Sequence, residues 1–392
     1  MSDFSTIDRL LQGFVDGGLP GCAMEIAKDG ETLYRGFFGY ADLEKKLPVT
    51  ESSVFRLASM SKLSLVTVMM MLYERGKFLL TDPVYSILPE WEHTTKFVIN
   101  PNGYQEIVPT KKAVTIGDVL SMKCGLPYCN FPGQADSETL RIMQQRMQPL
   151  WDRGHFTLRE QLKAMADVPQ LFEPGEHWLY GFSSEICAGI IEEVCGKSID
   201  AVFEELLFEP LGMDSTRSHY FGDMKERMVQ FYALGENGQP PSPCHTPLDD
   251  KHLPGKEHEC GWARLFSTTG DFSRLMQMLA CGGVYNGTRI MGRKTIDLLR
   301  TNTLTETMLR EDFTNDYLAG YGYGYGMRTL MDPYAGHHNG SVGAFGWTGG
   351  SGTWAEADPA EGVSIVYMHN LQPNLEEYHH LRMRAVAYGC LQ

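Results

Sequence analysis

Ser59 and Lys62 are the residues whose types and spacing most directly suggest chemistry, because they stand at the two ends of the tetrapeptide Ser-Met-Ser-Lys. Positions i and i+3 lie on one face of a helix, so the serine hydroxyl and the lysine amine can meet there. Burial and the positive end of the helix dipole both disfavour a charged ammonium, and they favour a neutral amine that accepts the serine proton. The pair predicts an activated serine that attacks a carbonyl carbon.

The residues that follow Lys62 decide whether this pair is buried. They predict a helix that is apolar nearly all round and therefore central in the protein. Its apolar members are Leu63, Leu65, Val66, Val68, Met69, Met70, Met71 and Leu72. Free backbone N–H groups at the start of such a helix can also stabilise an oxyanion. Two alternatives remain open: Ser59 can be a simple helix cap with Lys62 in solvent, and Ser61 is a rival nucleophile, although it faces elsewhere on a helix.

A tyrosine just before a second helix is the candidate for the second proton-transferring group of the site. The segment from Phe172 to Ser184 contains a turn, then Tyr180, then a helix cap at Ser183 or Ser184, and an apolar helical run follows it. A phenol on such a loop can point into a cleft. A nearby cationic lysine makes its ionisation easier, so that it can pass a proton. The alternative is a buried tyrosine that only packs.

A glycine-rich segment near the C-terminus is the third candidate. Residues 346–352 read Gly-Trp-Thr-Gly-Gly-Ser-Gly and open a predicted strand pair. Glycines at the entry to a strand let a ligand lie against the backbone, and a backbone N–H there can be a second oxyanion donor. The same composition also fits a β-bulge without a functional role.

Helix and strand patterns at the two ends of the chain must position these segments. We predict an amphipathic helix around residues 7–15, strands over 22–27 and 32–38, strands over 352–357 and 363–368, and a last helix over 375–388. Pairing the N-terminal hairpin with the C-terminal strands gives one antiparallel sheet. The expected fold is α+β: residues 1–60 and 320–392 form an α/β lobe, residues 61–319 form a mainly helical lobe, and a substrate cleft lies at their junction.

Composition excludes several kinds of partner. The formal net charge of −15 argues against binding nucleic acid, which needs a basic face. The longest mostly apolar stretch, Leu65 to Leu72, is far shorter than the roughly 20 residues that span a bilayer, and the N-terminus shows no signal-peptide pattern. Nine cysteines without a C-x-x-C pair indicate reduced thiols. We therefore expect a soluble, cytoplasmic protein.

No cofactor and no metal are predicted. Residues 320–326 alternate glycine with tyrosine but lack the spacing of a dinucleotide-binding loop, so we interpret them as a strand or loop with one aromatic face. The adjacent pairs His337–His338 and His379–His380 point their side chains apart, which does not suit metal ligation.

Taken together and in this order, the segments resemble the serine β-lactamase and penicillin-binding protein superfamily, and most closely its class C β-lactamase-like branch. The resemblance covers nearly the whole chain and rests on Phe55 to Lys62, Gly76 to Pro83, Pro174 to Tyr180, Ile191 to Lys197, Leu206 to Met213 and Phe266 to Asp271. It implies an antiparallel sheet flanked by helices beside an all-helical lobe. It also implies Ser59 as nucleophile, Lys62 as its proton partner and Tyr180 as general base and acid. The implied oxyanion hole is formed by the N–H groups of Ser59 and Gly350.

Departures from the superfamily pattern point to the substrate. Trp347 stands where β-lactamases and transpeptidases usually have a lysine that helps to hold the substrate carboxylate. Phe182 stands where they have asparagine or serine, and Tyr128 and Gly349 complete the predicted pocket. Such an apolar cleft favours an acyl chain or an aromatic ester over an anionic peptide or lactam. A tryptophan at this position also occurs in the family's esterases.

The resemblance therefore favours a carboxylesterase that works through an acyl-serine intermediate on small or medium acyl esters. A weak β-lactamase and a D-amino-acid peptidase or amidase are alternatives within the same chemistry. An acyltransferase is another, and it differs only in whether water or a second alcohol attacks the acyl-enzyme. A catalytically inactive binding or scaffold protein is the alternative outside this chemistry. One argument opposes this last alternative. A buried lysine without a partner lowers stability by several kcal/mol, so an inactive relative would gain nothing from retaining it.

Overall fold

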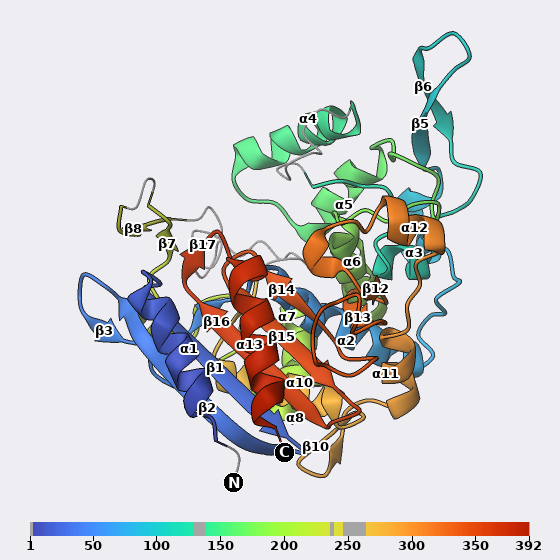
Figure 1. Ribbon diagram of the computed structural model, residues 1–392. Coiled ribbons are helices and arrows are strands. Elements are labelled where there is room, and N and C mark those ends of the chain that lie inside the picture. Colours follow the sequence, from blue (N-terminus) through green and yellow to red (C-terminus); the bar gives the residue numbers. More distant parts are fainter. Residues whose placement is uncertain (1–2, 129–137, 236–238, 246–263, 392) are drawn as a thin grey trace.

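The computed structural model describes residues 3–128, 138–235, 239–245 and 264–391, and it is built around an eight-stranded antiparallel sheet (Figure 1). In spatial order the strands are β12 (Tyr321–Tyr323), β13 (Arg328–Leu330), β14 (Phe345–Gly349), β15 (Thr353–Asp358), β16 (Val363–His369), β1 (Gly21–Lys28), β2 (Glu31–Asp42) and β3 (Leu47–Pro48). The C-terminal strand β16 pairs with the N-terminal strand β1, with Cys22 opposite His369 and Ile26 opposite Ile365. The predicted α+β fold, with one sheet made from both ends of the chain, is confirmed.

Alternation along the strands divides their side chains between two cores. On β1, Met24 and Ile26 face one core, and Ala23 faces the other. The first core lies beneath two helices that run side by side in Figure 1, α1 (Ser5–Asp16) and α13 (Glu376–Cys390). The apolar spacing that predicted α1 turns one stripe of that helix toward the sheet, and burial of the stripe fixes the helix there.

The opposite face of the sheet carries the larger core, which continues into the helical part of the chain. Helix α10 (Thr269–Ala280) packs against β1, β15 and β16, while α2 (Lys62–Glu74) packs against β14 and against α6 (Ser183–Cys195). The other α-helices of the described residues are α3 (Ile116–Leu120), α4 (Glu138–Arg153), α5 (Leu158–Ala166), α7 (Ile199–Phe203), α8 (Glu209–Leu211), α9 (Met224–Arg227), α11 (Arg293–Leu299) and α12 (Glu306–Glu311). All residues of α2 from Lys62 to Leu72 are buried, as its apolar run predicts.

Several short strands pair outside the large sheet. They are β4 (Phe55–Arg56) with β9 (Phe266–Ser267), β5 (Thr95–Ile99) with β6 (Gln105–Pro109), β10 (Val284–Tyr285) with β11 (Thr288–Arg289), and β7 (Tyr232–Ala233) with both β8 (Ser242–Pro243) and β17 (Leu371–Gln372). The β4–β9 pair lies just before the turn that carries Ser59, so it fixes where that turn begins. None of the helices in the described ranges is long and apolar enough to cross a membrane.

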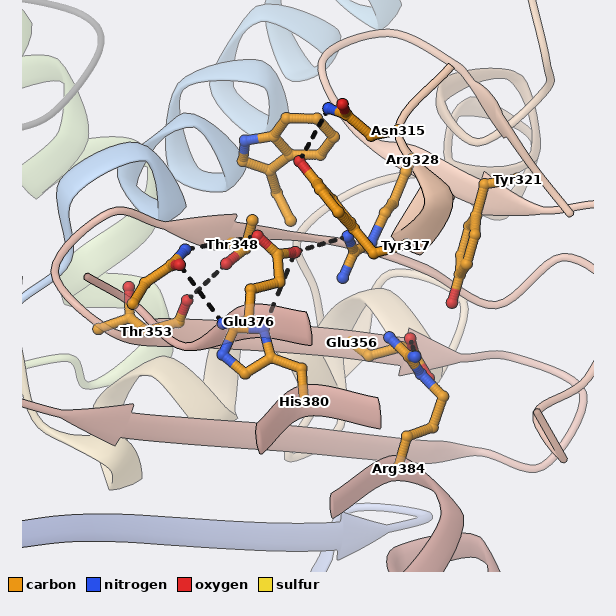
Figure 2. A network of polar contacts seen from close by, with 12 residues as sticks. Asn315, Tyr317, Tyr321, Arg328, Thr348, Thr353, Glu356, Glu376, His380 and Arg384 are labelled. Carbon is orange, nitrogen blue, oxygen red and sulfur yellow. Dashed lines mark hydrogen bonds and ion pairs between the residues drawn. The ribbon is translucent and has the colours of Figure 1, made fainter. Parts of the chain in front are cut away.

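Two buried ion pairs hold α13 against the sheet (Figure 2). Arg384 donates to Glu356 of β15 at 2.9 Å, and Arg328 of β13 donates to Glu376, the first residue of α13, at 2.8 Å. Burial opposes ionisation of Glu376, but the neighbouring His380 and the charge of Arg328 outweigh it and lower the pKa of Glu376 to about 2. The C-terminal helix is therefore fixed to the two strands that flank β14.

Two helix starts differ from the expectation drawn from the sequence. The α-helix of α2 begins at Lys62, because Ala58–Ser61 form a tighter 3-10 turn. Helix α6 has Phe182 at its cap position and no side-chain cap. The two serines expected to cap it direct their hydroxyls toward the neighbouring loop instead. In both places contacts with distant segments override the local helix signal.

Candidate active site

Ser59 lies on a strained turn between β4 and α2. The residue before it, Ala58, has a φ of 46°, in the left-handed region that residues with a Cβ rarely occupy. Such strain costs about 1 kcal/mol or more and persists where surrounding contacts enforce it. Here the N–H of Leu57 donates to Leu265 O at 3.0 Å, and Leu57 O accepts from Thr353 Oγ1 at 2.8 Å. The turn is thus held on one side by the loop before β9 and on the other by β15.

Lys62 lies beside Ser59 with its amine inside the protein. It is 1% exposed, and its Nζ donates a hydrogen bond to Ser59 Oγ at 3.1 Å. It is therefore not the solvent-facing lysine of the alternative interpretation. Ser61, the rival nucleophile, uses its Oγ to accept the backbone N–H of Leu265 at 3.1 Å. The lysine amine meets Ser59, as the i, i+3 spacing predicts.

Tyr180 approaches the same point from the loop before α6. That loop runs beside residues 122–127, where the N–H of Phe182 donates to Leu126 O at 3.1 Å. Gly181 is required at this crossing, because a Cβ there would lie 1.9 Å from the carbonyl oxygen of Leu126. The close crossing of two loops therefore sets the position of the phenol.

The phenol of Tyr180 contacts each of the other candidate groups. Lys62 Nζ lies 4.9 Å from the centre of the Tyr180 ring, and the Tyr180 oxygen is hydrogen-bonded to the Ser59 side chain. Trp347 Nε1 donates to the same oxygen at 3.0 Å. Burial raises the pKa of Tyr180 above its ordinary value, while the hydrogen bonds with Ser59 and Trp347 offset part of that rise. The structure thus brings Ser59, Lys62, Tyr180 and Trp347 into one cluster.

Gly349 and Gly350 carry the third segment to the nucleophile turn. Gly349 ends β14, and a Cβ on it would lie 2.1 Å from the carbonyl oxygen of Leu57. A residue without a side chain allows this approach, so the strand end lies directly beside the residues that lead to Ser59. Gly350 follows in the turn and is exposed, with no atom within 4 Å of where its Cβ would be. The N–H groups of Ser59 and Gly350 remain the predicted oxyanion donors.

The predicted pocket residues form a buried wall around this cluster. Tyr128 packs edge-on against Tyr180 and Phe182, with ring centres 5.5 and 4.8 Å away, and the Trp347 ring lies 5.2 Å from that of Tyr180. Trp347, Tyr128 and Phe182 are 5%, 6% and 9% exposed, so protein atoms cover most of their surface. Their contact with a substrate remains a prediction.

Three aromatic side chains of the same wall were not singled out from the sequence. Tyr323 of β12 lies 5.3 Å from the rings of both Trp178 and Trp347, and Phe313 packs edge-on against Trp178 at 4.8 Å. The glycine–tyrosine alternation at residues 320–326 predicts a segment with one aromatic face, and Tyr323 belongs to that face. No local pattern indicates that Trp178 and Phe313 meet at the same place.

The polar groups gathered at the site are a hydroxyl, an amine, a phenol and an indole N–H, which suit proton transfer around a nucleophile. Among the described residues, no three or more His, Cys, Asp or Glu side chains are grouped so that they could hold a metal ion. His338 and His379, from the two adjacent histidine pairs, instead form hydrogen bonds with Tyr321 and Tyr367.

Known proteins resemble this chain over most of its length. The beta-lactamase family model matches residues 7–388. Esterase EstB of Burkholderia gladioli is 27% identical over 366 residues, which cover 90% of this chain and 86% of EstB. A putative D-alanyl-D-alanine carboxypeptidase of Escherichia coli K12 is 25% identical over 386 residues, which cover 93% of this chain and 81% of that protein.

A solved structure shares the fold over almost the whole length. EstCE1, a hydrolase with promiscuous acyltransferase activity, matches with a TM-score of 0.79 at 22% identity, over 98% of each chain. The family model spans nearly every residue, and the resemblance drawn from the sequence is confirmed: this chain belongs to the beta-lactamase family of serine hydrolases.

Proposed function

We propose that Ser59 forms an acyl-enzyme and that the substrates are carboxylic esters with small or medium acyl groups. The observation that carries the proposal is the Lys62 amine, 1% exposed and hydrogen-bonded to Ser59 Oγ at 3.1 Å. A buried amine beside a hydroxyl gives the serine a base within reach, which is what an activated nucleophile requires.

The reaction begins when Ser59 Oγ attacks the ester carbonyl carbon. Its proton passes to the neutral amine of Lys62 while the carbonyl electrons move onto oxygen, where the N–H groups of Ser59 and Gly350 stabilise the charge. Collapse of this intermediate breaks the bond to the alcohol, which takes a proton from the phenol of Tyr180. Lys62 then returns a proton to the phenolate. Water attacks the acyl-serine by the reverse sequence of proton transfers and releases the acid.

The side chains around the cluster favour a neutral ester over an anionic substrate. Trp347 and Phe182 are aromatic where lactamases usually have groups for a carboxylate or an amide, and with Tyr128 they offer an apolar wall to an acyl or aryl group. The relative EstB is an esterase, which supports this choice. The carboxypeptidase relative and the acyltransferase activity of EstCE1 make D-peptide hydrolysis and acyl transfer the alternatives.

Relative rates on matched substrates test the ester proposal. We expect kcat/KM for p-nitrophenyl butyrate to exceed that for the β-lactam nitrocefin and for an acyl-D-Ala-D-Ala peptide, because Trp347 offers no cation to their carboxylates. Faster turnover of either anion would replace the esterase proposal with a lactamase or a peptidase. Adding a second alcohol distinguishes acyl transfer, since a transferase forms a new butyrate ester where a hydrolase releases butyric acid.

We also propose that the protein works in the cytoplasm on a small-molecule substrate. The seven described cysteines are free thiols, and the other two, Cys129 and Cys260, lie outside the described residues. A reducing compartment maintains thiols in this state. Alkylation of the unfolded protein, taken directly from its cells without reductant, should modify all nine cysteines. A smaller number would indicate disulfides and a different compartment.

A further inference from the structure

We propose that Tyr128 is a positioning residue for this reaction, whose ring holds the protonated amine of Lys62 during acyl transfer. The inference rests on the proposed roles of Ser59 and Lys62. It gives a second role to a residue that the sequence suggests only as a pocket wall. The geometry of one amine and two aromatic rings in the buried cluster carries it.

The amine of Lys62 faces two aromatic rings. Its Nζ lies 4.9 Å from the ring centre of Tyr180 and 5.6 Å from that of Tyr128. The rings meet edge to face, 5.5 Å apart and inclined at 70°, so they form a corner around the amine. A cation within about 6 Å of a ring is attracted by the ring quadrupole, more strongly where water is excluded. Lys62 is 1% exposed, so water screens this attraction very little.

Tyr128 is fixed in this corner by its neighbours. Its backbone follows the bridge between Pro127 and Gly181, which joins its loop to the loop before α6. Phe182 packs edge-on against its ring at 4.8 Å, and its OH lies 3.4 Å from Ser184 Oγ. Tyr128 is 6% exposed, so protein atoms cover most of its surface and hold its ring 5.6 Å from the Lys62 amine.

The phenol of Tyr128 is not suited to carry a proton. Burial raises its pKa well above the ordinary value, and the neighbouring Tyr180 and the Glu185 carboxylate of α6 add to that rise, while the Ser184 hydroxyl opposes it. The side chain therefore stays neutral over the working range of an enzyme. What it offers to Lys62 is the electron-rich face of its ring.

The ring acts when Lys62 carries the extra proton. In the proposed reaction the proton of Ser59 moves to the amine as Oγ bonds to the carbonyl carbon, and the resulting ammonium is shielded from water. Burial alone makes that charge unfavourable. The two rings offset part of the penalty in the step where the charge appears, which is an effect on the transition state and not on substrate binding. Loss of the Tyr128 ring face should therefore lower kcat and leave KM nearly unchanged.

A series of fluorinated phenylalanines in place of Tyr128 tests this inference. Tyr128→Phe keeps the ring and should leave kcat within about threefold of its original value. One, two and three ring fluorines withdraw electron density from the ring face with little change of shape. The value of kcat should therefore fall with each added fluorine, by roughly two- to thirty-fold in total, at constant KM. A kcat that stays level across the series overturns the proposal. A change in KM alone also overturns it and identifies Tyr128 as a substrate-contacting residue.

Two controls distinguish a failure of the role of Tyr128 from a general effect of fluorination and from a failure of the proposed function. The same fluorinated series at Phe203, a buried ring of α7 that packs on Phe208 at 5.7 Å, should leave kcat unchanged. An equal fall there would show a general effect of fluorination and overturn the role of Tyr128. Ser59→Ala should be inactive. Residual activity in that variant would contradict the proposed function. If Ser59→Ala is inactive but kcat does not change across the Tyr128 series, only the role of Tyr128 is contradicted.

Discussion

The indole N–H of Trp347 donates a hydrogen bond to the phenol oxygen of Tyr180, with 3.0 Å between Nε1 and the oxygen and 5.2 Å between the ring centres. The sequence suggests Trp347 only as an apolar wall for the substrate. A donor to a phenol oxygen stabilises the phenolate more than the phenol, so it lowers the pKa of the group. Trp347 is therefore placed to act on the proposed proton carrier as well as on the shape of the cleft.

Trp347→Phe keeps an aromatic ring but removes this donor. The pKa of Tyr180, which burial already raises, should rise further, so that proton transfer through the phenol slows. A hydrogen bond to a charged group is worth about 1.5–3 kcal/mol, and kcat for an ester should accordingly fall by roughly 10- to 150-fold.

Trp178→Phe is the matched control for that variant. Within the described structure the Nε1 of Trp178 has no hydrogen-bond partner, so this change removes an indole N–H without breaking a hydrogen bond. Its kcat should stay within a few-fold of the original value. Equal losses in the two variants would show that ring size, and not the hydrogen bond to Tyr180, explains the effect.

Gly349→Ala and Gly350→Ala should differ sharply in activity although the positions are adjacent. A Cβ at Gly349 would lie 2.1 Å from the Leu57 oxygen, so β14 must move away from the nucleophile turn. A displacement of about 1 Å can cost 100-fold in rate, and we expect at least that loss in kcat. Gly350→Ala points its Cβ into open space and should keep most activity, because the proposed contribution there is a backbone N–H. Similar kcat values, with folding checked by circular dichroism, would exclude the close approach as a requirement.

The individual strands, the outer helices and the Ser59–Lys62 contact could be predicted because their signals are local. The apolar spacing over residues 7–15 and the strand pattern over 363–368 each define elements with a buried face, and the helix and the strand follow from them. The contact between serine and lysine also needs only one turn of chain, so the spacing alone was enough to suggest it.

Other features depend on segments that are far apart in the sequence. The hydrogen bond between Trp347 and Tyr180 joins residues 167 positions apart, and no local pattern contains that information. The left-handed Ala58 and its 3-10 turn arise because Leu57 is held from both sides by remote residues. The ring of Tyr128 beside the Lys62 amine likewise results from the crossing of two loops.

The buried ion pair between Glu376 and Arg328 should contribute strongly to stability (Figure 2). Glu376→Gln leaves the guanidinium buried without its countercharge, which should lower the free energy of unfolding by about 3–5 kcal/mol at pH 7. The folded pKa of Glu376, about 2, lies below the ordinary carboxyl value. The contribution is therefore complete above about pH 4.3 and is lost as the pH falls toward 2.

Urea unfolding at pH 7 and pH 3 measures both effects. Asp223→Asn is the control, because it breaks an ion pair with Arg227 in which the Asp223 side chain is 72% exposed. Exposed pairs contribute at most about 1 kcal/mol. If Glu376→Gln loses no more stability at pH 7 than this control, the buried pair does not have the importance assigned to it.

His369 should make the protein less stable in mild acid. It is 1% exposed, its Nδ1 accepts the N–H of Leu371 at 3.1 Å, and its Nε2 donates to Asn374 O at 2.9 Å. Burial, together with the neighbouring His379, lowers the pKa of His369 to about 3. Since this lies below the ordinary value of about 6.5, the contribution to stability is complete above about pH 6.5 and declines as the pH falls toward 3.

One histidine with this shift loses about 2 kcal/mol of stability between pH 7.5 and pH 5. His369→Gln keeps an acceptor and a donor but does not titrate in this range, so its free energy of unfolding should depend less on pH by about that amount. Chemical denaturation at the two pH values gives the comparison. An identical pH dependence in both proteins would assign the acid sensitivity to other groups.

The proposed mechanism depends on the contact between Lys62 and Ser59, and covalent labelling of the serine tests whether that contact activates it. A fluorophosphonate probe followed by peptide mass mapping should place an adduct on Ser59 in the wild-type protein. Folded Ser59→Ala should show no adduct, and Lys62→Met should label roughly 100- to 10,000-fold more slowly because the serine has lost its base. An adduct on Ser61, or labelling of Lys62→Met at the wild-type rate, would contradict the proposed mechanism.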